Sequence, residues 1–252
     1  MKYHELFDFR STFQIKRKGL VSLVVSALIG GANVAYASPT GGNVVAGSAT
    51  IAQSGTVTNI SQSTAKAVIN WDSFSVARNE TVNFNQPNAN SVTLNRVVGT
   101  NSSLIEGMMN ANGQVFLVNP NGVVFSRDAQ VNVGGLVAST LNITDTNFMN
   151  GVYRFEGASN NSVLNLGTIT TNNGYTALLA KTVQNEGVIR ATLGHVELAS
   201  GNKMTLNING NSLVKLTIDE GTLHGLIENK GLIKADGGEV YLTTQALNSV
   251  LD

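Results

Sequence analysis

The sequence predicts an all-β protein in which short strands wind into a parallel β-helix. Three observations carry this prediction: a repeat of about 20 residues, apolar residues that alternate with polar ones inside each copy, and many turn-forming residues. The chain of 252 residues contains 26 Gly and 31 Asn, and only 13% of its residues are charged. This composition favours frequent sharp corners and differs from that of a disordered chain.

The repeat begins at an asparagine that is followed two positions later by a glycine. Copies start at Asn165, Asn185 and Asn229, and clear 20-residue coils are expected over 165–252. One copy cannot bury its apolar face alone, whereas stacked copies can, with three strands and three corners in each coil. Leucine-rich repeats share this period but require a denser leucine pattern. The stacking predicts two ladders of core side chains, Ile169, Ile189, Ile233 and Leu178, Leu198, Leu242.

Two segments depart from the period. The spacing of 44 residues between Asn185 and Asn229 reads as two periods plus four. Within it, residues 204–219 alternate on both sides of an Asn-Gly pair, which predicts either an extra-helical hairpin or an irregular coil. Residues 38–95 are β-rich without a visible period. We expect an N-terminal cap and the first coils there, because the first coil would otherwise expose an unpaired edge.

Residues 1–37 have the pattern of a secretory signal peptide. A basic cluster at 16–18 precedes an apolar run at 19–29, and Ala35 and Ala37 supply the small residues of a cleavage site. The run is shorter than the roughly 20 residues that a transmembrane helix needs. Cleavage is expected after Ala37, which leaves Ser38 as the first residue of the mature chain.

Charge and cysteine content exclude several classes of function. The signal peptide holds five of the 16 basic and two of the 16 acidic residues, so the mature chain has 11 basic and 14 acidic residues. A net charge of −3 provides no electrostatic footprint for nucleic acid. The chain has no cysteine, which excludes disulfides and cysteine-based metal sites.

Residues 118–125, with the sequence VNPNGVVF, predict a tight corner between two strands. Asn119 suits the first position of a type I turn and Pro120 fixes φ at the second. Asn121 is tolerated at the third position, and Gly122 supplies a positive φ. Turn chemistry therefore accounts for every residue type in this corner.

The corner and its flanks carry a family resemblance. Residues 115–125 (VFLVNPNGVVF), followed by residues 129–140 (AQVNVGGLVAST), closely resemble the N-terminal secretion domain of two-partner secretion exoproteins of the filamentous haemagglutinin type. The resemblance implies a right-handed β-helix with an N-terminal cap and small extra-helical elements. It also implies export through the Sec machinery and recognition in the periplasm by an outer-membrane transporter with POTRA domains.

The resemblance implies a secretion module that reaches the medium or the surface of a Gram-negative bacterium. The expected parent is a filamentous haemagglutinin-like adhesin that contacts host cells through a downstream region. A haemolysin and a contact-dependent growth inhibition toxin remain alternatives. Because such exoproteins are usually far longer, the chain is expected to be a fragment or a truncated product. The Asn119–Gly122 corner is then either a surface read by the transporter or a structural turn without a contact role.

Enzymatic activity is not expected. Some β-helix proteins cleave polysaccharides, so this alternative from another functional class requires a search for catalytic residues. The sequence lacks G-x-S-x-G, H-E-x-x-H and phosphate-loop motifs, and its aspartates do not fall in a calcium-ligand spacing. Carboxylates from adjacent coils could still meet in space. We expect no catalytic residue, no metal and no cofactor.

Overall fold

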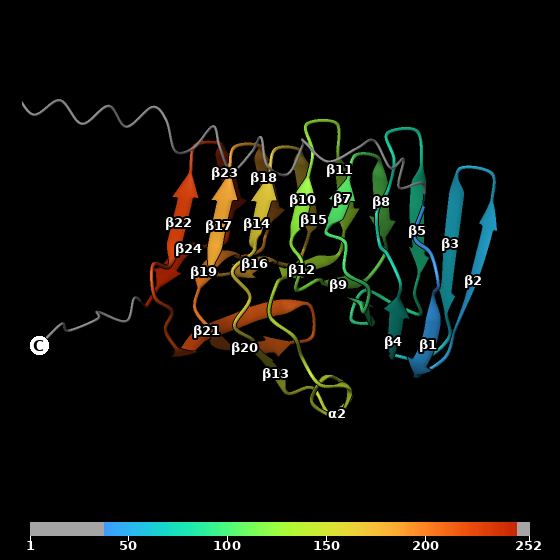
Figure 1. Cartoon of the computed structure of the whole chain (residues 1–252), viewed down its shortest axis with the longest axis horizontal. Coiled ribbons are helices and arrows are strands. Elements are labelled where there is room, and N and C mark those ends of the chain that lie inside the picture. The colour runs from blue at the N-terminus through green and yellow to red at the C-terminus, as the bar shows by residue number, and fades with distance from the viewer. Residues whose placement is uncertain (1–37, 246–252) are drawn as a thin grey trace, which may run out of the picture. The chain divides into compact units, whose positions relative to one another are not determined.

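Alternating apolar and polar residues, with Asn and Gly at the corners, wind the chain into coils of short strands (Figure 1). The computed structural model describes residues 38–245. Each complete coil passes through three sheets in the same order, and strands of successive coils pair in parallel. Connections between parallel neighbours are right-handed in nearly all proteins. The right-handed parallel β-helix predicted from the sequence is confirmed.

The three sheets are numbered in the order in which a coil visits them. Sheet 1 contains β2 (Ala49–Ser54), β3 (Val57–Gln62), β5 (Thr81–Asn85), β8 (Met108–Ala111), β11 (Gln130–Val133), β15 (Thr168–Asn172), β18 (Val188–Thr192) and β23 (Leu232–Asp236). Sheet 2 contains β1 (Asn43–Ala46), β4 (Lys66–Trp71), β6 (Val92–Val97), β9 (Gln114–Val118), β12 (Gly135–Ser139), β16 (Thr176–Ala180), β19 (Val196–Ser200) and β24 (Val240–Thr244). Sheet 3 contains β7 (Ser103–Ile105), β10 (Val123–Phe125), β14 (Ser162–Asn165), β17 (Thr182–Asn185) and β22 (Leu226–Asn229).

The N-terminal cap consists of two strands that run against the direction of the winding. β1 pairs antiparallel with β4, and β2 pairs antiparallel with β3. From β3 onward the strands of sheets 1 and 2 pair in parallel. The strands of the first coil therefore have no unpaired edge in sheets 1 and 2, as expected of an N-terminal cap.

The two predicted ladders occupy equivalent positions in successive coils. Ile169, Ile189 and Ile233 align across β15, β18 and β23, while the three leucines align across β16, β19 and β24. The members in the first two coils are completely buried, and Ile233 is half-buried. Leu242 departs from the expected interior position: it is 53% exposed, because no further coil covers β24 within the described residues.

The repeated glycine serves a close approach between coils. A side chain on Gly194 would place its Cβ 1.5 Å from the carbonyl oxygen of Gly174, and Gly238 approaches Gly194 in the same way. The positive φ values at this corner lie one residue earlier, at Asn173 and Leu193. Distance between backbones, and not the φ of the repeated glycine, therefore explains why the repeat requires glycine there.

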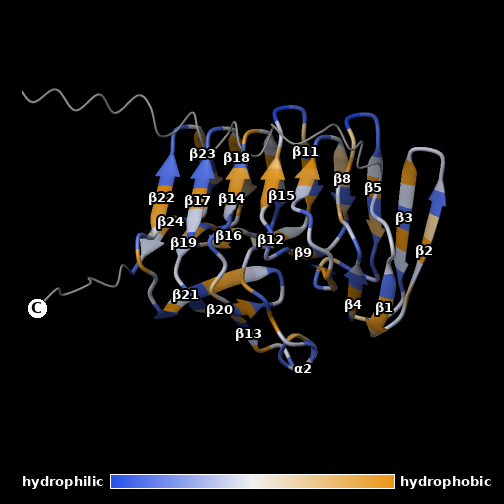
Figure 2. Ribbon diagram, viewed as in Figure 1, coloured by the Kyte–Doolittle hydropathy of each residue, from blue (hydrophilic) through white to orange (hydrophobic). Residues whose placement is uncertain are grey.

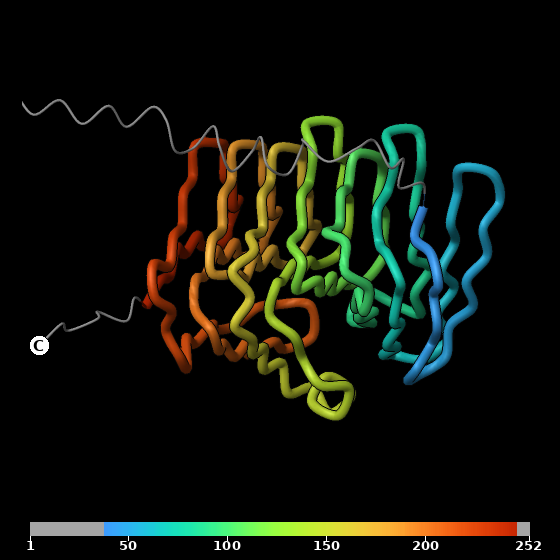
Figure 3. The backbone as a smooth tube through the Cα atoms, viewed as in Figure 1, coloured from blue at the N-terminus to red at the C-terminus, as the bar shows by residue number. Residues whose placement is uncertain are grey.

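Two excursions leave the β-helix between sheets 2 and 3, and they lie on the same side of it (Figure 3). The first excursion, residues 140–161, contains the short helix α2 (Asp145–Met149) and β13 (Tyr153–Glu156). The second, residues 201–225, contains the antiparallel pair β20 (Lys203–Asn209) and β21 (Ser212–Glu220). β20 also pairs with β13, so the excursions form one extra-helical sheet.

Of the two possibilities predicted for 204–219, the extra-helical hairpin is confirmed. β17 pairs directly with β22, so the segment between them is a single coil with an insertion. The hairpin packs against the outer face of sheet 2, where Figure 2 shows apolar residues on both layers. The resulting outer core includes Phe116, Phe148, Phe155, Tyr175, Met204 and Leu206.

The central strands of sheet 2 are consequently buried on both faces. All residues of β9, β12, β16 and β19 are buried. The inner face packs inside the β-helix and the outer face packs under the excursions. Within residues 38–245, no helix has both the length and the hydropathy needed to cross a membrane. Surface on which a partner could dock therefore lies on sheets 1 and 3, on the corners and on the outer face of the excursions.

Candidate recognition surface

The Asn119–Gly122 corner joins β9 of sheet 2 to β10 of sheet 3. The amide of Gly122 donates to the carbonyl oxygen of Asn119 at 3.0 Å, and Gly122 has φ +108°. The side-chain oxygen of Asn119 accepts a hydrogen bond of 2.9 Å from the amide of Asn121. These contacts make a closed turn in which the first asparagine bonds to backbone within the corner.

Asn119 is completely buried and holds neighbouring coils together. Its side-chain nitrogen donates to the carbonyl oxygen of Asn101 at 2.9 Å and to the hydroxyl of Ser103 at 3.0 Å, both in the preceding coil. Its backbone amide donates to the carbonyl oxygen of Ser139 in the following coil at 2.9 Å. A partner that docks on the folded domain cannot reach this side chain, so its direct contact is with the protein itself.

The exposed part of the corner is Pro120 and one edge of Asn121. The carbonyl oxygen of Pro120 accepts hydrogen bonds from Ser159 at 2.6 Å and from Asn161 at 2.9 Å, both in the first excursion. The side-chain nitrogen of Asn121 donates to the carbonyl oxygen of Gly99 at 2.9 Å. The corner and the excursion therefore form one continuous polar surface, and any recognition by this motif must use that surface.

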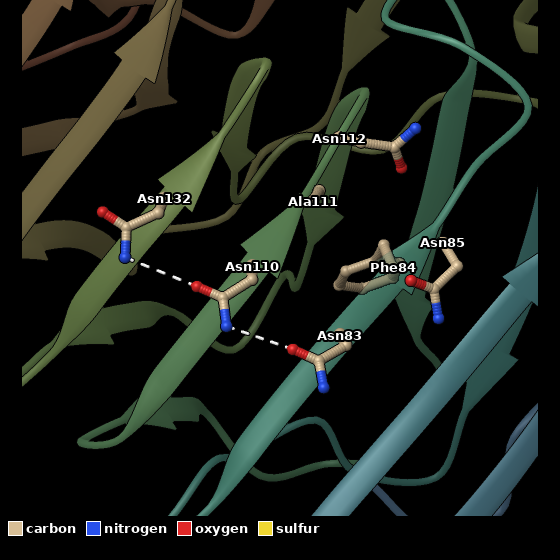
Figure 4. Close-up of a pocket in the computed structure, with 7 residues that line it drawn as sticks. All are labelled: Asn83, Phe84, Asn85, Asn110, Ala111, Asn112 and Asn132. Carbon is tan, nitrogen blue, oxygen red and sulfur yellow. Dashed lines mark hydrogen bonds between the residues drawn. The ribbon is translucent and has the colours of Figure 1, made fainter.

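A second polar surface lies on sheet 1, around a shallow hollow of about 350 Å³ (Figure 4). Its lining residues are Asn83, Phe84, Asn85, Asn110, Ala111, Asn112 and Asn132. Side-chain amides form a ladder across adjacent strands, from Asn132 to Asn110 at 3.4 Å, from Asn110 to Asn83 at 3.1 Å, and from Asn83 to Asn59 at 3.1 Å. No titratable side chain lines the hollow, so it offers hydrogen-bond donors and acceptors without an acid or a base.

Two charged side chains, the partly exposed Lys66 and the buried Glu197, make contacts within the fold. Lys66 donates hydrogen bonds of 3.1 Å to the carbonyl oxygens of Phe148 and Met149 at the end of α2, and desolvation lowers its pKa. Burial raises the pKa of Glu197, and a hydrogen bond of 2.6 Å from Thr243 opposes part of that shift. Residues 38–245 contain no group of three His, Cys, Asp or Glu side chains placed to hold a metal ion.

The predicted cleavage site falls at the edge of the described chain. Ala35 and Ala37 lie outside the described residues, and Ser38 is the first residue described. Ser38 is buried and contacts Glu80, a residue that the sequence analysis did not single out. Its only sequence signal is an acidic residue within the β-rich stretch 38–95, which by itself does not indicate burial.

Residues 34–252 match the family described as the TPS secretion domain. The chain belongs to this family. The resemblance to the secretion domain of two-partner secretion exoproteins is therefore confirmed, and the protein carries the TPS domain of an exported exoprotein. The match covers the corner, the hollow and both excursions of the described β-helix.

Solved and curated relatives agree with this assignment. The TPS domain is similar to the crystal structure of the HMW1 secretion domain from Haemophilus influenzae, with a TM-score of 0.73 and 36% identity, over 81% of this chain and 55% of that chain. Two proteins from Haemophilus influenzae, both named heme/hemopexin-binding protein, are 34% and 33% identical over 92% of this chain. The chain spans only 26% and 28% of their lengths.

Proposed function

We propose that the TPS domain is the part of its exoprotein that an outer-membrane transporter with POTRA domains recognises in the periplasm. Recognition then leads the parent protein to the medium or to the surface of a Gram-negative bacterium. The observation that supports this proposal most is the family match over residues 34–252, which includes the entire described β-helix. The described residues thus form a single folded unit, with both excursions packed on it.

Within this proposal, the transporter reads the exposed polar surface around Pro120 and not the side chain of Asn119. Pro120 is exposed and its carbonyl oxygen accepts a hydrogen bond from the first excursion, whereas Asn119 is buried in the β-helix. A partner on this surface would contact the corner, Ser159 and Asn161 together. Asn119 would contribute only by holding the corner in place.

The proposal is tested by producing the full chain in cells together with its transporter. The wild-type chain is expected in the medium, and its export is expected to depend on the transporter. Pro120→Ala should reduce the exported fraction while the purified domain keeps its melting temperature. Val214→Ala is the matched control, because Val214 is 62% exposed on β21 of the second excursion, whereas Pro120 bonds to the first.

Export of wild type without the transporter would overturn the proposed function. Export of Pro120→Ala at the level of Val214→Ala would instead contradict only the role of the corner. The two outcomes are separate, because the first concerns the domain and the second concerns one part of its surface.

For the parent protein we propose two tasks that the downstream region would carry. One is adhesion to host cells by a filamentous haemagglutinin-like protein, with a haemolysin or a growth inhibition toxin as alternatives. The other is binding of heme or hemopexin, which the identity to two heme/hemopexin-binding proteins over 92% of this chain favours. Capture of the full-length parent on immobilised hemopexin supports the second task, whereas host-cell binding without such capture supports the first.

We further propose that the domain is not an enzyme. The amide-lined hollow and the scattered carboxylates support this proposal, because acid–base cleavage of a polysaccharide requires positioned titratable groups. Incubation of the mature domain with a panel of acidic polysaccharides and Ca²⁺ should release no unsaturated products. Release of such products would show a polysaccharide-cleaving enzyme instead.

A further inference from the structure

The carboxylate of Glu80 is buried against the first described residue of the chain. Glu80 is 7% exposed and Ser38 is 4% exposed. One carboxylate oxygen accepts hydrogen bonds from the backbone amide of Ser38 at 2.7 Å and from that of Ala77 at 2.9 Å. The other oxygen accepts a hydrogen bond of 2.8 Å from the hydroxyl of Ser38. Two of its three donors therefore belong to one residue that lies 42 positions away in the sequence.

This carboxylate has no cationic partner among the described residues. The ion pairs formed within residues 38–245 do not include Glu80. An ionised carboxylate that is removed from water without a cation is costly, and hydrogen bonds from neutral donors offset only part of that cost. Of the three donors, the nitrogen of Ser38 alone could become a cation, and it does so only as a chain terminus.

Signal peptide cleavage would make that terminus. The small residues Ala35 and Ala37 predict hydrolysis of the bond between Ala37 and Ser38. The reaction consumes one water molecule, leaves a carboxylate on Ala37 and frees the amino group of Ser38. With an ordinary pKa of about 7.7–8.0, that amino group takes up a proton near neutral pH. We propose that the buried Glu80 carboxylate is the binding site for the α-ammonium of the mature chain at Ser38.

The backbone of Ser38 provides an independent argument. Ser38 has φ +56°, in the left-handed region that residues with a side chain rarely adopt. Part of this restriction comes from the carbonyl group of the preceding residue. Cleavage removes that residue, so the conformation that reaches Glu80 is less restricted in the mature chain. Processing therefore both relieves the backbone and supplies the missing charge.

The ion pair between the Ser38 α-ammonium and the Glu80 carboxylate would bind the N-terminus to the first coil. Glu80 lies immediately before β5, and the neighbouring Thr40 donates its amide to the carbonyl oxygen of Ser73 at 2.9 Å. Residues 38–40 thus run along the connections of the first coil before the chain enters the cap. Removal of the signal peptide would strengthen this attachment, so that the β-helix is more stable after processing than before it. The inference rests on cleavage after Ala37 and does not require the transporter.

The experiment compares chains that differ only at the amino terminus. One begins with a free amino group at Ser38, produced from a fusion partner that is removed without leaving extra residues. The other begins at Ala35 and keeps the peptide bond before Ser38. The free terminus should lower the equilibrium constant for unfolding by about tenfold, which corresponds to about 1.4 kcal/mol. In Glu80→Gln this difference should vanish, whereas it should persist in Asp72→Asn, a charge-matched control at an exposed carboxylate.

Equal unfolding constants for the two wild-type chains would overturn the proposal, as would a difference that survives in Glu80→Gln. If Glu80→Gln does not fold, acetylation of the Ser38 amino group in the wild-type chain decides the matter, since an unchanged unfolding midpoint contradicts the pair. Terminal sequencing of the exported protein should give Ser38 first, and any other residue overturns the proposal. Failure of transporter-dependent export would leave the unfolding measurements unaffected, and terminal sequencing could then use the processed protein from the periplasm.

Discussion

The side-chain nitrogen of Asn165 donates a hydrogen bond of 2.7 Å to the side-chain oxygen of Asn185, and both residues are completely buried. Asn185 in turn donates to Asn229 at 2.7 Å. These are the asparagines at which the three copies of the repeat begin. Asn185 both accepts and donates along the ladder, while the side-chain oxygen of Asn165 accepts from the backbone amide of Gly167 at 3.2 Å. The ladder therefore satisfies polar groups that the wall of the β-helix hides from water.

Replacement of Asn185 by alanine should remove both rungs of this ladder. The buried amide of Asn165 then loses its acceptor, and an unsatisfied buried group costs about 1–3 kcal/mol. The free energy of unfolding, measured with denaturant, should fall by that amount. Asn132→Ala is the control, because Asn132 is exposed and makes a longer bond of 3.4 Å; its effect should stay within about 0.5 kcal/mol. Equal losses in the two variants would contradict a special role for the buried ladder.

Ile189→Ala should destabilise the inner core strongly. Ile189 is completely buried between Ile169 and Ile233, and large-to-small changes at such positions cost about 2–5 kcal/mol. Leu242→Ala provides a comparison at the exposed end of the other ladder, where about 1 kcal/mol or less is expected because the side chain is already half in water. A loss below about 0.5 kcal/mol for Ile189→Ala, measured by chemical unfolding, would show that the register is wrong.

The repeat was predictable because its spacing equals the number of residues in one coil. Each asparagine and each glycine recurs where successive corners stack, so the period, the ladders and the parallel pairing follow from the sequence. The hairpin at 204–219 was predictable from the alternation around its Asn-Gly pair, but its packing was not, because alternation identifies strands and not what covers them. β20 and β21 alternate like coil strands, yet they pair with each other and cover sheet 2. The first excursion was missed for a related reason, since Phe148 and Phe155 look like core residues of the β-helix itself.

The corner was predictable only as a turn. Asn, Pro and Gly at these positions specify its backbone, and the hydrogen bond from Gly122 to Asn119 has the spacing that turn chemistry requires. The burial of Asn119 depends on Asn101 and Ser103, which approach it only after the coils have stacked. Burial of Glu80 depends in the same way on Ser38, which is distant in sequence. Contacts between coils, and the burial that they cause, could therefore not be predicted from the local sequence.

Asn119→Asp illustrates the consequence of those contacts. From turn chemistry alone, aspartate is a mild substitution, because it keeps the acceptor at the first position of the turn. In the folded domain, the Asn119 side-chain nitrogen donates to Asn101 and Ser103, and aspartate would lose both bonds and place a charge inside the wall. We expect a loss of about 3–5 kcal/mol, as for a buried unpaired charge, together with reduced export. Thermal unfolding and export should therefore fall together.

Pro120→Ala and Asn119→Asp form a pair that separates the two interpretations of the corner. Pro120 is exposed, and alanine keeps the carbonyl group that accepts from Ser159 and Asn161. The melting temperature should therefore stay close to that of wild type in Pro120→Ala and drop in Asn119→Asp. A fully stable Asn119→Asp domain with lost export would show that the side chain of Asn119 is itself read by a partner.

Glu197→Gln should stabilise the domain at neutral pH and leave its stability unchanged in acid. Glu197 is 3% exposed, and burial raises its pKa above the ordinary value near 4.5, although the hydrogen bond from Thr243 opposes part of that shift. The native state therefore binds this proton more tightly than the unfolded chain does. The stabilising contribution of the protonated carboxyl is complete below about pH 4.5 and is lost as the pH rises through the raised pKa of the native state.

Glutamine mimics the protonated carboxyl and retains an oxygen that can accept from Thr243. The difference in free energy of unfolding between Glu197→Gln and wild type should thus be near zero below about pH 4.5 and should grow as the pH rises toward neutrality. Unfolding curves at a series of pH values measure this difference directly. Glu106→Gln is the control, because Glu106 is partly exposed and forms no ion pair with the described residues. A Glu197→Gln variant that is less stable than wild type at neutral pH would show that the charged carboxylate holds β19 to β24.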